Sequence, residues 1–304
     1  MTAATPRTVE QYLDSLRSAL EGADRALIQD ALYDAEEHLR AELAQHSGDN
    51  QGDVLASIVA SYGAPEEVAD AYRSNEKTIQ AALRTPPPRP RTSSIGRFFG
   101  VYSDPRAYLS LLYMLLALLT GTIYFTFAVT GLSMSIGLAI LIIGVPFFLL
   151  FVGATRLVAL AEGRLVETML GTRMPRRPVY PDRDAPFLRR VGDMLKDPRT
   201  WGTLVYFILM LPLGVFYFVF AVVGICFSIA MLVMPILILL YHMGVVGMNI
   251  QIDGSVELPH PAVLPFISIL GLLLLTVTMH LARGIGYLHG QLAKTLLVQA
   301  QSSS

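Results

Sequence analysis

Four ionisable residues with candidate binding chemistry lie close together in the sequence. Asp253, Glu257 and His260 belong to the polar segment 249–261, and His242 lies in the apolar run before it. Two carboxylates and an imidazole can bind a cation, and an unperturbed histidine titrates near pH ~6.5, so the group could also respond to mild acid. The alternative is a solvated loop whose charges only keep it out of a bilayer, and the sequence leaves both interpretations open.

The remaining histidines do not form a recognisable site. Eight residues separate His38 from His46, and neither this spacing nor the neighbouring Glu37 suits a metal site, because no third ligand is evident. His280 lies near the end of an apolar run, where a hydrogen-bonded histidine is a simpler interpretation than a proton relay. No phosphate-binding glycine loop or nucleophile–base pattern occurs in the sequence. We therefore expect no enzyme activity, no catalytic residue, no metal and no cofactor.

The elements that would position these residues belong to a duplicated apolar region. Asp104-Pro105-Arg106 recurs as Asp197-Pro198-Arg199, at an offset of 93 residues. At that offset five further identities are Leu111 and Leu204, Tyr113 and Tyr206, Gly121 and Gly214, Tyr124 and Tyr217, and Gly131 and Gly224. Near the end of each copy Gly163 matches Gly290 at an offset of 127, so the second copy holds 34 extra residues. The pattern predicts two tandem copies of one structural unit.

Each Asp-Pro-Arg motif is expected to begin a helix at the membrane surface. Asp104 and Asp197 are suited to cap the helix N-terminus, and the prolines suit the first helical position. Arg106 and Arg199 would meet lipid phosphates at the cytosolic surface. We therefore assign both motifs a structural role as caps where helices enter the membrane.

Charge divides the chain into two different parts. Residues 1–83 carry 15 Asp or Glu and 6 Lys or Arg, whereas residues 84–304 carry 17 Lys or Arg and 9 Asp or Glu. No basic segment followed by an apolar one occurs at the N-terminus, so we expect no signal peptide and a cytosolic first part. The single cysteine, Cys226, lies in an apolar run and excludes an intrachain disulfide.

The positions of the arginines predict the topology of the apolar region. Arginines cluster before the first apolar run and again within 171–196, and such clusters mark the cytosolic side of a membrane. The run 107–160 has room for two crossings of about 20 residues each, with an external turn expected at 130–133. In the second copy, 225–246 is expected to be a kinked or re-entrant element on the external side. This gives four full spans, and a fifth crossing is the alternative.

Apolar spacing in residues 1–83 predicts a small helical domain. One predicted helix carries an apolar face from Leu27 to Leu43. Thr8 and Asp24 are placed as N-caps, and Pro65 as the first residue of a further helix. With Tyr12-Leu13, Glu37-His38-Leu39 and the block Tyr62-Gly63-Ala64-Pro65-Glu66-Glu67-Val68-Ala69, residues 8–75 resemble the HAAS-type helical signalling domain of bacterial membrane proteins.

Residues 95–298 carry a second resemblance, to the sensor domain found ahead of the kinase core in bacterial histidine kinases and also alone. It rests on the two Asp-Pro-Arg motifs, on Leu211-Pro212-Leu213-Gly214, on Ile252-Asp253 and on Leu281-Ala282-Arg283-Gly284. No dimerisation histidine helix or ATP-binding domain follows in this sequence. The resemblance therefore implies that any kinase output comes from another protein.

Both resemblances imply signalling rather than chemistry. We expect a non-enzymatic membrane sensor that passes an external or membrane cue to a cytosolic regulator or kinase through residues 1–83. The other expected partners are membrane lipids and a second copy of the chain in a homodimer, with no nucleic acid. The alternative is a lipid-binding protein or a small-solute conduit or transporter.

We therefore predict an all-α protein with a small cytosolic helical domain and a polytopic membrane bundle built from two tandem repeats. It would lie in the bacterial cytoplasmic (inner) membrane, with both termini cytosolic. The predicted parts are the acidic domain 1–83, a Pro/Arg-rich linker 84–96, membrane repeat 1 at 97–170, a basic cytosolic linker with an amphipathic helix at 171–196, and membrane repeat 2 at 197–298 with the external loop 249–261.

Overall fold

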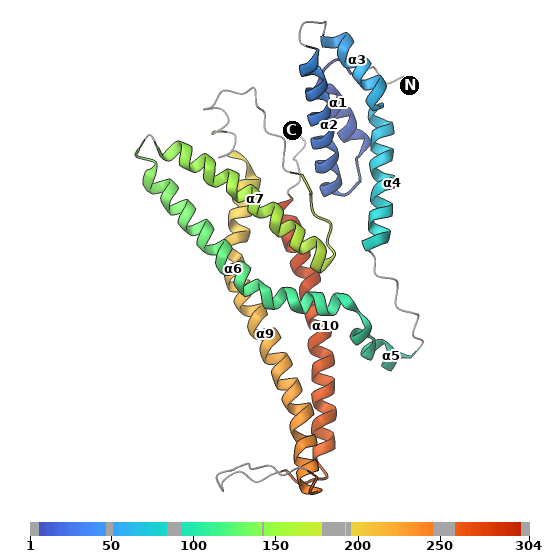
Figure 1. Ribbon diagram of the computed structural model, residues 1–304, viewed down its shortest axis with the longest axis vertical. Helices are drawn as coiled ribbons and strands as arrows, with labels where there is room; N and C mark the ends of the chain where they lie inside the picture. The colour runs from blue at the N-terminus through green and yellow to red at the C-terminus, as the bar shows by residue number, and fades with distance from the viewer. Residues whose placement is uncertain are drawn as a thin grey trace. The chain divides into compact units, whose positions relative to one another are not determined.

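The all-α prediction is confirmed. In the computed structural model, the residues described are 6–46, 51–83, 93–141, 143–177, 192, 196–245 and 259–298, and these contain helices and no strands (Figure 1). The predicted linker 84–96 falls largely outside these residues. The predicted amphipathic helix before Asp197 falls almost wholly outside them.

The N-terminal domain consists of four helices around one apolar core. They are α1 (Val9–Ala19), α2 (Arg25–Gln45), α3 (Gln51–Tyr62) and α4 (Pro65–Leu83). Thr8 accepts a hydrogen bond from the backbone of Gln11, and Asp24 from that of Ala26, so both residues cap helices as expected. The core includes Tyr12, Leu16, Leu20, Ala31, Ala35, Leu39 and Leu55. The apolar face expected on α2 is therefore the face that is buried.

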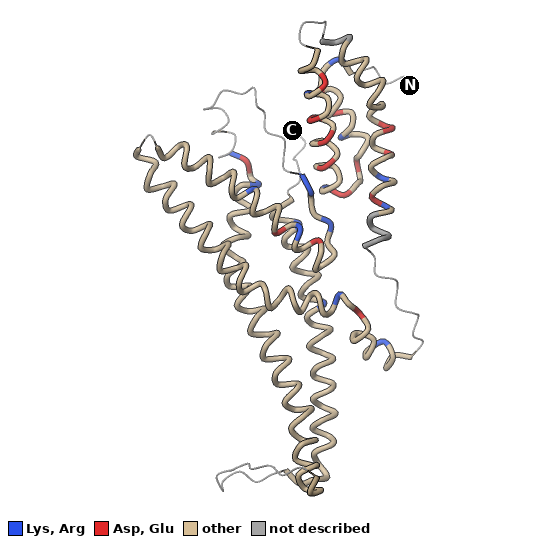
Figure 2. Tube along the Cα trace, in the orientation of Figure 1, with Lys and Arg blue, Asp and Glu red and all other residues tan. Residues whose placement is uncertain are grey.

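Four further helices are long and apolar enough to cross a membrane among the described residues. They are α6 (Pro105–Leu138), α7 (Gly144–Leu170), α9 (Pro198–His242) and α10 (Leu264–Leu297). Two short elements, α5 (Ser94–Phe98) and the 3₁₀ helix η1 (Phe99–Ser103), precede α6. Figure 2 shows few charged residues along most of α6, α9 and α10, whereas charges are dense in the N-terminal domain. The number of candidate spans equals the four expected.

The turn expected at 130–133 is wrong. Helix α6 continues to Leu138, and the chain turns just before α7 begins at Gly144. A Cβ atom on Gly131 would lie 2.1 Å from the ring of Phe151, so this glycine allows α6 and α7 to pack closely. The sequence cannot distinguish a glycine that ends a helix from one that serves helix packing, because both need only the absence of a side chain.

The kinked or re-entrant element expected at 225–246 is not a separate re-entrant element among the described residues. Residues up to His242 continue α9, which has 45 residues and contains Pro212 and Pro235. At a rise of 1.5 Å per residue this helix is about 67 Å long, more than twice a hydrocarbon core of about 30 Å. Some of the extra residues of the second copy therefore lengthen α9 and α10, and residues 246–258 lie outside the described residues.

The chain divides into two compact units, each of which draws on several helices. Unit 1 comprises Met1–Pro86, Ala128–Tyr206 and Gly290–Ser304, and unit 2 comprises Pro87–Phe127 and Phe207–His289. The N-terminal domain, α7 and the end of α10 belong to unit 1. Most of α6, α9 and α10 belongs to unit 2.

Within unit 2, two glycines allow α6 and α9 to cross in close contact. A Cβ atom on Gly121 would lie 2.4 Å from the carbonyl oxygen of Met210, and one on Gly214 would lie 2.2 Å from that of Ala117. Gly121 aligns with Gly214 and Ala117 with Met210 at the offset of 93 residues. The crossing therefore joins the same two positions of each copy, and small residues suit such close backbone approach in membranes.

Candidate functional site

The strongest cluster of charged side chains lies where α7 ends, in unit 1. Gly171 has φ of 72° and terminates α7, so the chain reverses direction there. The following residues, 172–177, are here named the strap. A Cβ atom on Gly290 of α10 would lie 2.2 Å from Oγ1 of Thr172, so the strap leaves α7 in close contact with α10. The strap then reaches the N-terminal domain.

Arg173 of the strap is surrounded by three carboxylates from three helices. Its guanidinium lies 2.9 Å from Asp30 of α2, 3.2 Å from Glu76 of α4 and 3.3 Å from Glu167 of α7. The side chain of Arg173 is only 9% exposed, and those of its three partners are 6–8% exposed. Arg176 adds a second cation, 3.1 Å from Glu167. We name these five residues the Arg173 cluster.

Hydrogen bonds to the strap backbone reinforce the contact. The N–H groups of Arg176 and Arg177 donate to Oδ1 of Asp30 at 2.7 and 2.9 Å. The side-chain amide of Gln29 donates to the carbonyl of Arg177 at 2.7 Å. Arg177 also pairs with Asp34 at 2.9 Å. Helix α2 therefore holds both the side chains and the backbone of the strap.

The end of α10 contributes a further ion pair to the same domain. Lys294 donates to Asp24, the residue that caps α2. The strap that follows α7 and the last turn of α10 therefore both contact the N-terminal domain.

Burial and charge act in opposite directions in the Arg173 cluster. Burial raises the pKa of Asp30, although the backbone N–H groups of Arg176 and Arg177 and the guanidinium of Arg173 counteract it. Burial lowers the pKa of Arg173, but Asp30, Glu76 and Glu167 raise it further, so its pKa is above the ordinary value. Arg173 is therefore held as a cation, whereas ionised Asp30 is disfavoured relative to water.

A second polar group is buried in unit 2 around His289 of α10. The hydroxyl of Tyr113 is hydrogen-bonded to Nε2 of His289 at 2.6 Å, and that of Tyr217 to Nδ1 at 3.2 Å. In unit 1, the hydroxyl of Tyr206 donates to Glu162 of α7 at 2.7 Å. Tyr113 aligns with Tyr206 at the offset of 93, and Glu162 with His289 at the offset of 127. The same contact therefore occurs once in each unit.

The two Asp-Pro-Arg motifs make matching contacts as well. Asp104 accepts a hydrogen bond from the backbone of Arg106, and Asp197 from that of Arg199, each at 3.0 Å. The second oxygen of Asp104 pairs with Arg283 of α10 at 2.9 Å in unit 2. In unit 1, Asp197 pairs with Arg156 of α7 at 3.3 Å. Each motif therefore caps its own helix and binds an arginine from the other copy.

The residues predicted for ligand binding are not brought together among those described. Asp253 and Glu257 lie outside the described residues. His242 is the exposed last residue of α9, and His260 is exposed before α10, where its Nδ1 accepts from the backbone of Ala262 at 3.3 Å. The ring of His280 is hydrogen-bonded to the carbonyl of Phe98 at 2.8 Å.

Comparison with known families decides how this chain is classified. A family profile described as "Putative sensor" matches residues 113–297, which is more than half of the chain. The chain belongs to the Sensor family. The HAAS family profile matches residues 11–71 of the N-terminal domain, so both resemblances are confirmed. No curated protein and no solved structure gave a match.

The Arg173 cluster joins the HAAS domain to the part of the chain that matches the Sensor family. Asp30 lies within the HAAS match, and Arg173, Arg176 and Glu167 lie within the Sensor match. Sequence reasoning missed this site, although it noted both the acidic domain and the basic segment after the first repeat. The complementary charges of these segments were the signal that could have paired them.

Proposed function

We propose that this member of the Sensor family is a non-enzymatic signal-transducing membrane protein that uses its HAAS domain as the output. The observation that carries the proposal is the Arg173 cluster, in which one buried cation neutralises carboxylates from α2, α4 and α7. A change at the end of α7 is transmitted through Glu167 and the strap to Asp30 and Glu76. The cue is external or comes from the membrane itself.

Such a cluster favours two distinct states over a gradual change. Charged groups this deeply buried are tolerated only while they are paired, and removing one partner of a buried pair typically costs about 3–5 kcal/mol. A shift of the strap that separates Arg173 from its partners therefore favours complete release of the HAAS domain into water. Release exposes Asp30, Asp34 and Glu76, an acidic surface suited to a basic surface of a cytosolic regulator or kinase.

The proposal places the protein in the bacterial cytoplasmic membrane with both termini in the cytosol. Four candidate spans and the Sensor match support insertion in a membrane. The orientation is supported by the basic residues at the Asp-Pro-Arg ends of the helices.

The test is capture of cytosolic proteins by the full chain in its own membrane, with wild type compared with Arg173→Gln. This variant removes the cation shared by Asp30, Glu76 and Glu167, and Arg176 remains beside Glu167. We therefore expect the amount of captured regulator or kinase to change several-fold. Arg164→Gln is the matched control, because Arg164 lies on α7 but is exposed. Capture of no regulator or kinase by any variant, in any growth condition, would contradict the proposal.

Different observations bear on the two alternative functions, a small-solute conduit and a lipid-binding protein. The conduit was supported by the duplicated bundle and by a possible re-entrant element at 225–246, and the described part of that element is instead the end of α9. The conduit hypothesis would be supported if liposomes containing the full chain showed solute flux and if altering His242 abolished that flux. Lipid binding is favoured by a pocket in unit 1 that is lined by Arg156, Arg199 and Thr200.

A further inference from the structure

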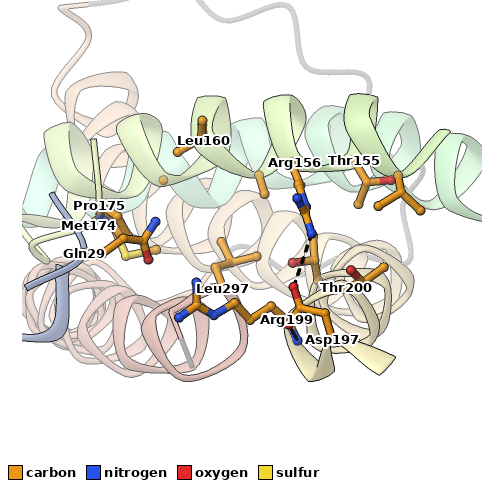
Figure 3. A pocket seen from close by; sticks show the side chains of 14 residues that line it. Gln29, Thr155, Arg156, Leu160, Met174, Pro175, Asp197, Arg199, Thr200 and Leu297 are labelled. Atoms are coloured by element: carbon orange, nitrogen blue, oxygen red, sulfur yellow. Dashed lines mark hydrogen bonds and ion pairs between the residues drawn. The ribbon is translucent and has the colours of Figure 1, made fainter. Parts of the chain in front are cut away.

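A pocket in unit 1 lies between α7 and the first turns of α9, with α10 and the HAAS domain at its border. It has a volume of about 70 Å³. Its apolar lining includes Val152 and Leu160 of α7 and Leu297 of α10, and its polar lining includes Arg156, Arg199 and Thr200 (Figure 3). A buried water needs roughly 15 Å³ on this measure, so the space accommodates a compact group of a few non-hydrogen atoms.

The polar side of the pocket is built for an anion. Arg156 and Arg199 supply two positive charges and Asp197 one negative charge, so the lining is cationic. The pocket also lies at the N-terminus of α9, where the helix dipole favours negative charge, and where the backbone N–H groups of Arg199 and Thr200 already donate to Asp197. Phosphate oxygens suit guanidinium groups because both form paired, charge-assisted hydrogen bonds.

The hydroxyl of Thr200 points to a ligand independently of these charges. Thr200 is 5% exposed, and its Oγ1 has no hydrogen-bond partner among the described residues, although it lines the pocket. Burying a hydroxyl without a partner costs about 1–3 kcal/mol. A bound oxygen acceptor would remove that cost.

The corresponding position in unit 2 is filled and apolar. Thr200 aligns with Ala107 at the offset of 93, and Val152 aligns with Met279 at the offset of 127. Ala107 and Met279 pack against Val101 of η1, which is 1% exposed. The two copies therefore differ at this position. In unit 2, Val101 packs against Ala107 and Met279, whereas in unit 1 the pocket is lined by the hydroxyl of Thr200, which has no hydrogen-bond partner among the described residues.

We propose that this pocket binds the phosphate group of an anionic membrane lipid. The guanidinium groups of Arg156 and Arg199 bind the phosphate oxygens, and the hydroxyl of Thr200 donates a hydrogen bond to one of them. The cavity is too small for acyl chains, which leave it along the partly exposed side chains of Ala159 and Leu160. Because α7, α9 and α10 are all candidate spans, a lipid phosphate reaches this site more readily than a free anion does.

The site also has a route to the HAAS domain. Gln29 of α2 and Met174 of the strap both line the pocket, next to residues of the Arg173 cluster. A bound lipid is therefore placed to affect the docking of the HAAS domain. This regulatory role rests on the proposed signalling function, whereas lipid binding itself does not.

The experiment counts lipids bound to the purified full chain by native mass spectrometry in detergent, with phosphatidylglycerol compared with phosphatidylcholine. We expect tight binding of one phosphatidylglycerol, weakened by about tenfold or more in Arg199→Gln. Arg106→Gln is the matched control, because it removes the same charge from the other Asp-Pro-Arg motif. Thr200→Val should weaken binding several-fold without lowering the thermal midpoint of the lipid-free protein, since it removes an unpaired hydroxyl.

Three outcomes would overturn the proposal. They are equal binding of the two lipids, equal losses in Arg199→Gln and Arg106→Gln, and displacement of the lipid by inorganic phosphate at matching concentration, which would make a free anion the ligand. None of these readouts needs a cytosolic regulator. Failure of lipid binding is therefore distinguishable from failure of the signalling proposal, which protein capture tests.

Discussion

Arg173 and Asp30 contact each other but should respond oppositely to neutralisation. Arg173→Gln leaves three buried carboxylates without their main cation, so we expect the strap to detach, at a cost of roughly 3–5 kcal/mol. Asp30→Asn should retain docking, because its side-chain oxygen still accepts from Arg176 and Arg177, and Arg173 keeps Glu76 and Glu167. Hydrogen exchange of the Arg176 and Arg177 amides measures both effects. Equal loss of protection in the two variants would contradict this assignment.

The pH dependence of docking follows from the raised pKa of Asp30. A carboxyl whose pKa is raised in the docked state favours docking most when it is protonated. Its contribution is therefore complete below the ordinary pKa of 3.8 and is lost as pH rises through the raised value. Acidification from neutral pH should strengthen docking in wild type relative to Asp30→Asn. Amide protection is compared between the two proteins at each pH, so that effects common to both proteins cancel.

The same aligned position carries an imidazole in one unit and a carboxyl in the other. The ring of His289 is hydrogen-bonded to the hydroxyls of Tyr113 and Tyr217, whereas the carboxylate of Glu162 accepts a hydrogen bond from the hydroxyl of Tyr206. Both side chains are at most 1% exposed. Their tyrosine partners compensate for the loss of water, which is the condition for burying such groups in a membrane helix.

At the scale of the helices, glycines allow α6 and α9 to approach each other closely where they cross. Gly121→Ala should destabilise the protein by about 1–3 kcal/mol, because its Cβ would lie 2.4 Å from the carbonyl oxygen of Met210. Gly153→Ala is the control, since no atom lies within 4 Å of its Cβ position, and alanine favours a helix by up to about 1 kcal/mol. Thermal unfolding in detergent should show a lower midpoint for the first variant alone. An unchanged midpoint for Gly121→Ala would refute the close crossing of α6 and α9.

At the scale of the whole molecule, the topology is the main prediction. Single cysteines at Ala139, Arg164, Ser255 and Ser303, in a chain with Cys226 replaced, report the side of the membrane that each occupies. Four spans with cytosolic termini predict that an impermeant external reagent labels Ala139 and Ser255 only. External labelling of Ser303 would establish a fifth crossing or an inverted protein, and would exclude a cytosolic C-terminus.

The sequence by itself determined the features that depend on neighbouring residues and on solvent. The caps at Thr8 and Asp24, the buried face of α2 and the four apolar helices all follow from local spacing and hydropathy. The two family resemblances rest on local motifs in the same way. The turn predicted around Gly131 was wrong, because this glycine serves the packing of α6 against Phe151 of α7, which no local pattern shows.

Only the tertiary structure decided which distant charges meet. Arg173 and Asp30 are 143 residues apart in the sequence, and Tyr113 and His289 are 176 residues apart. No local pattern specifies such partners, because a side chain's burial and pairing depend on how whole helices pack. The sequence showed an acidic domain and a basic segment, and the fold selected one arginine between them to bind three carboxylates.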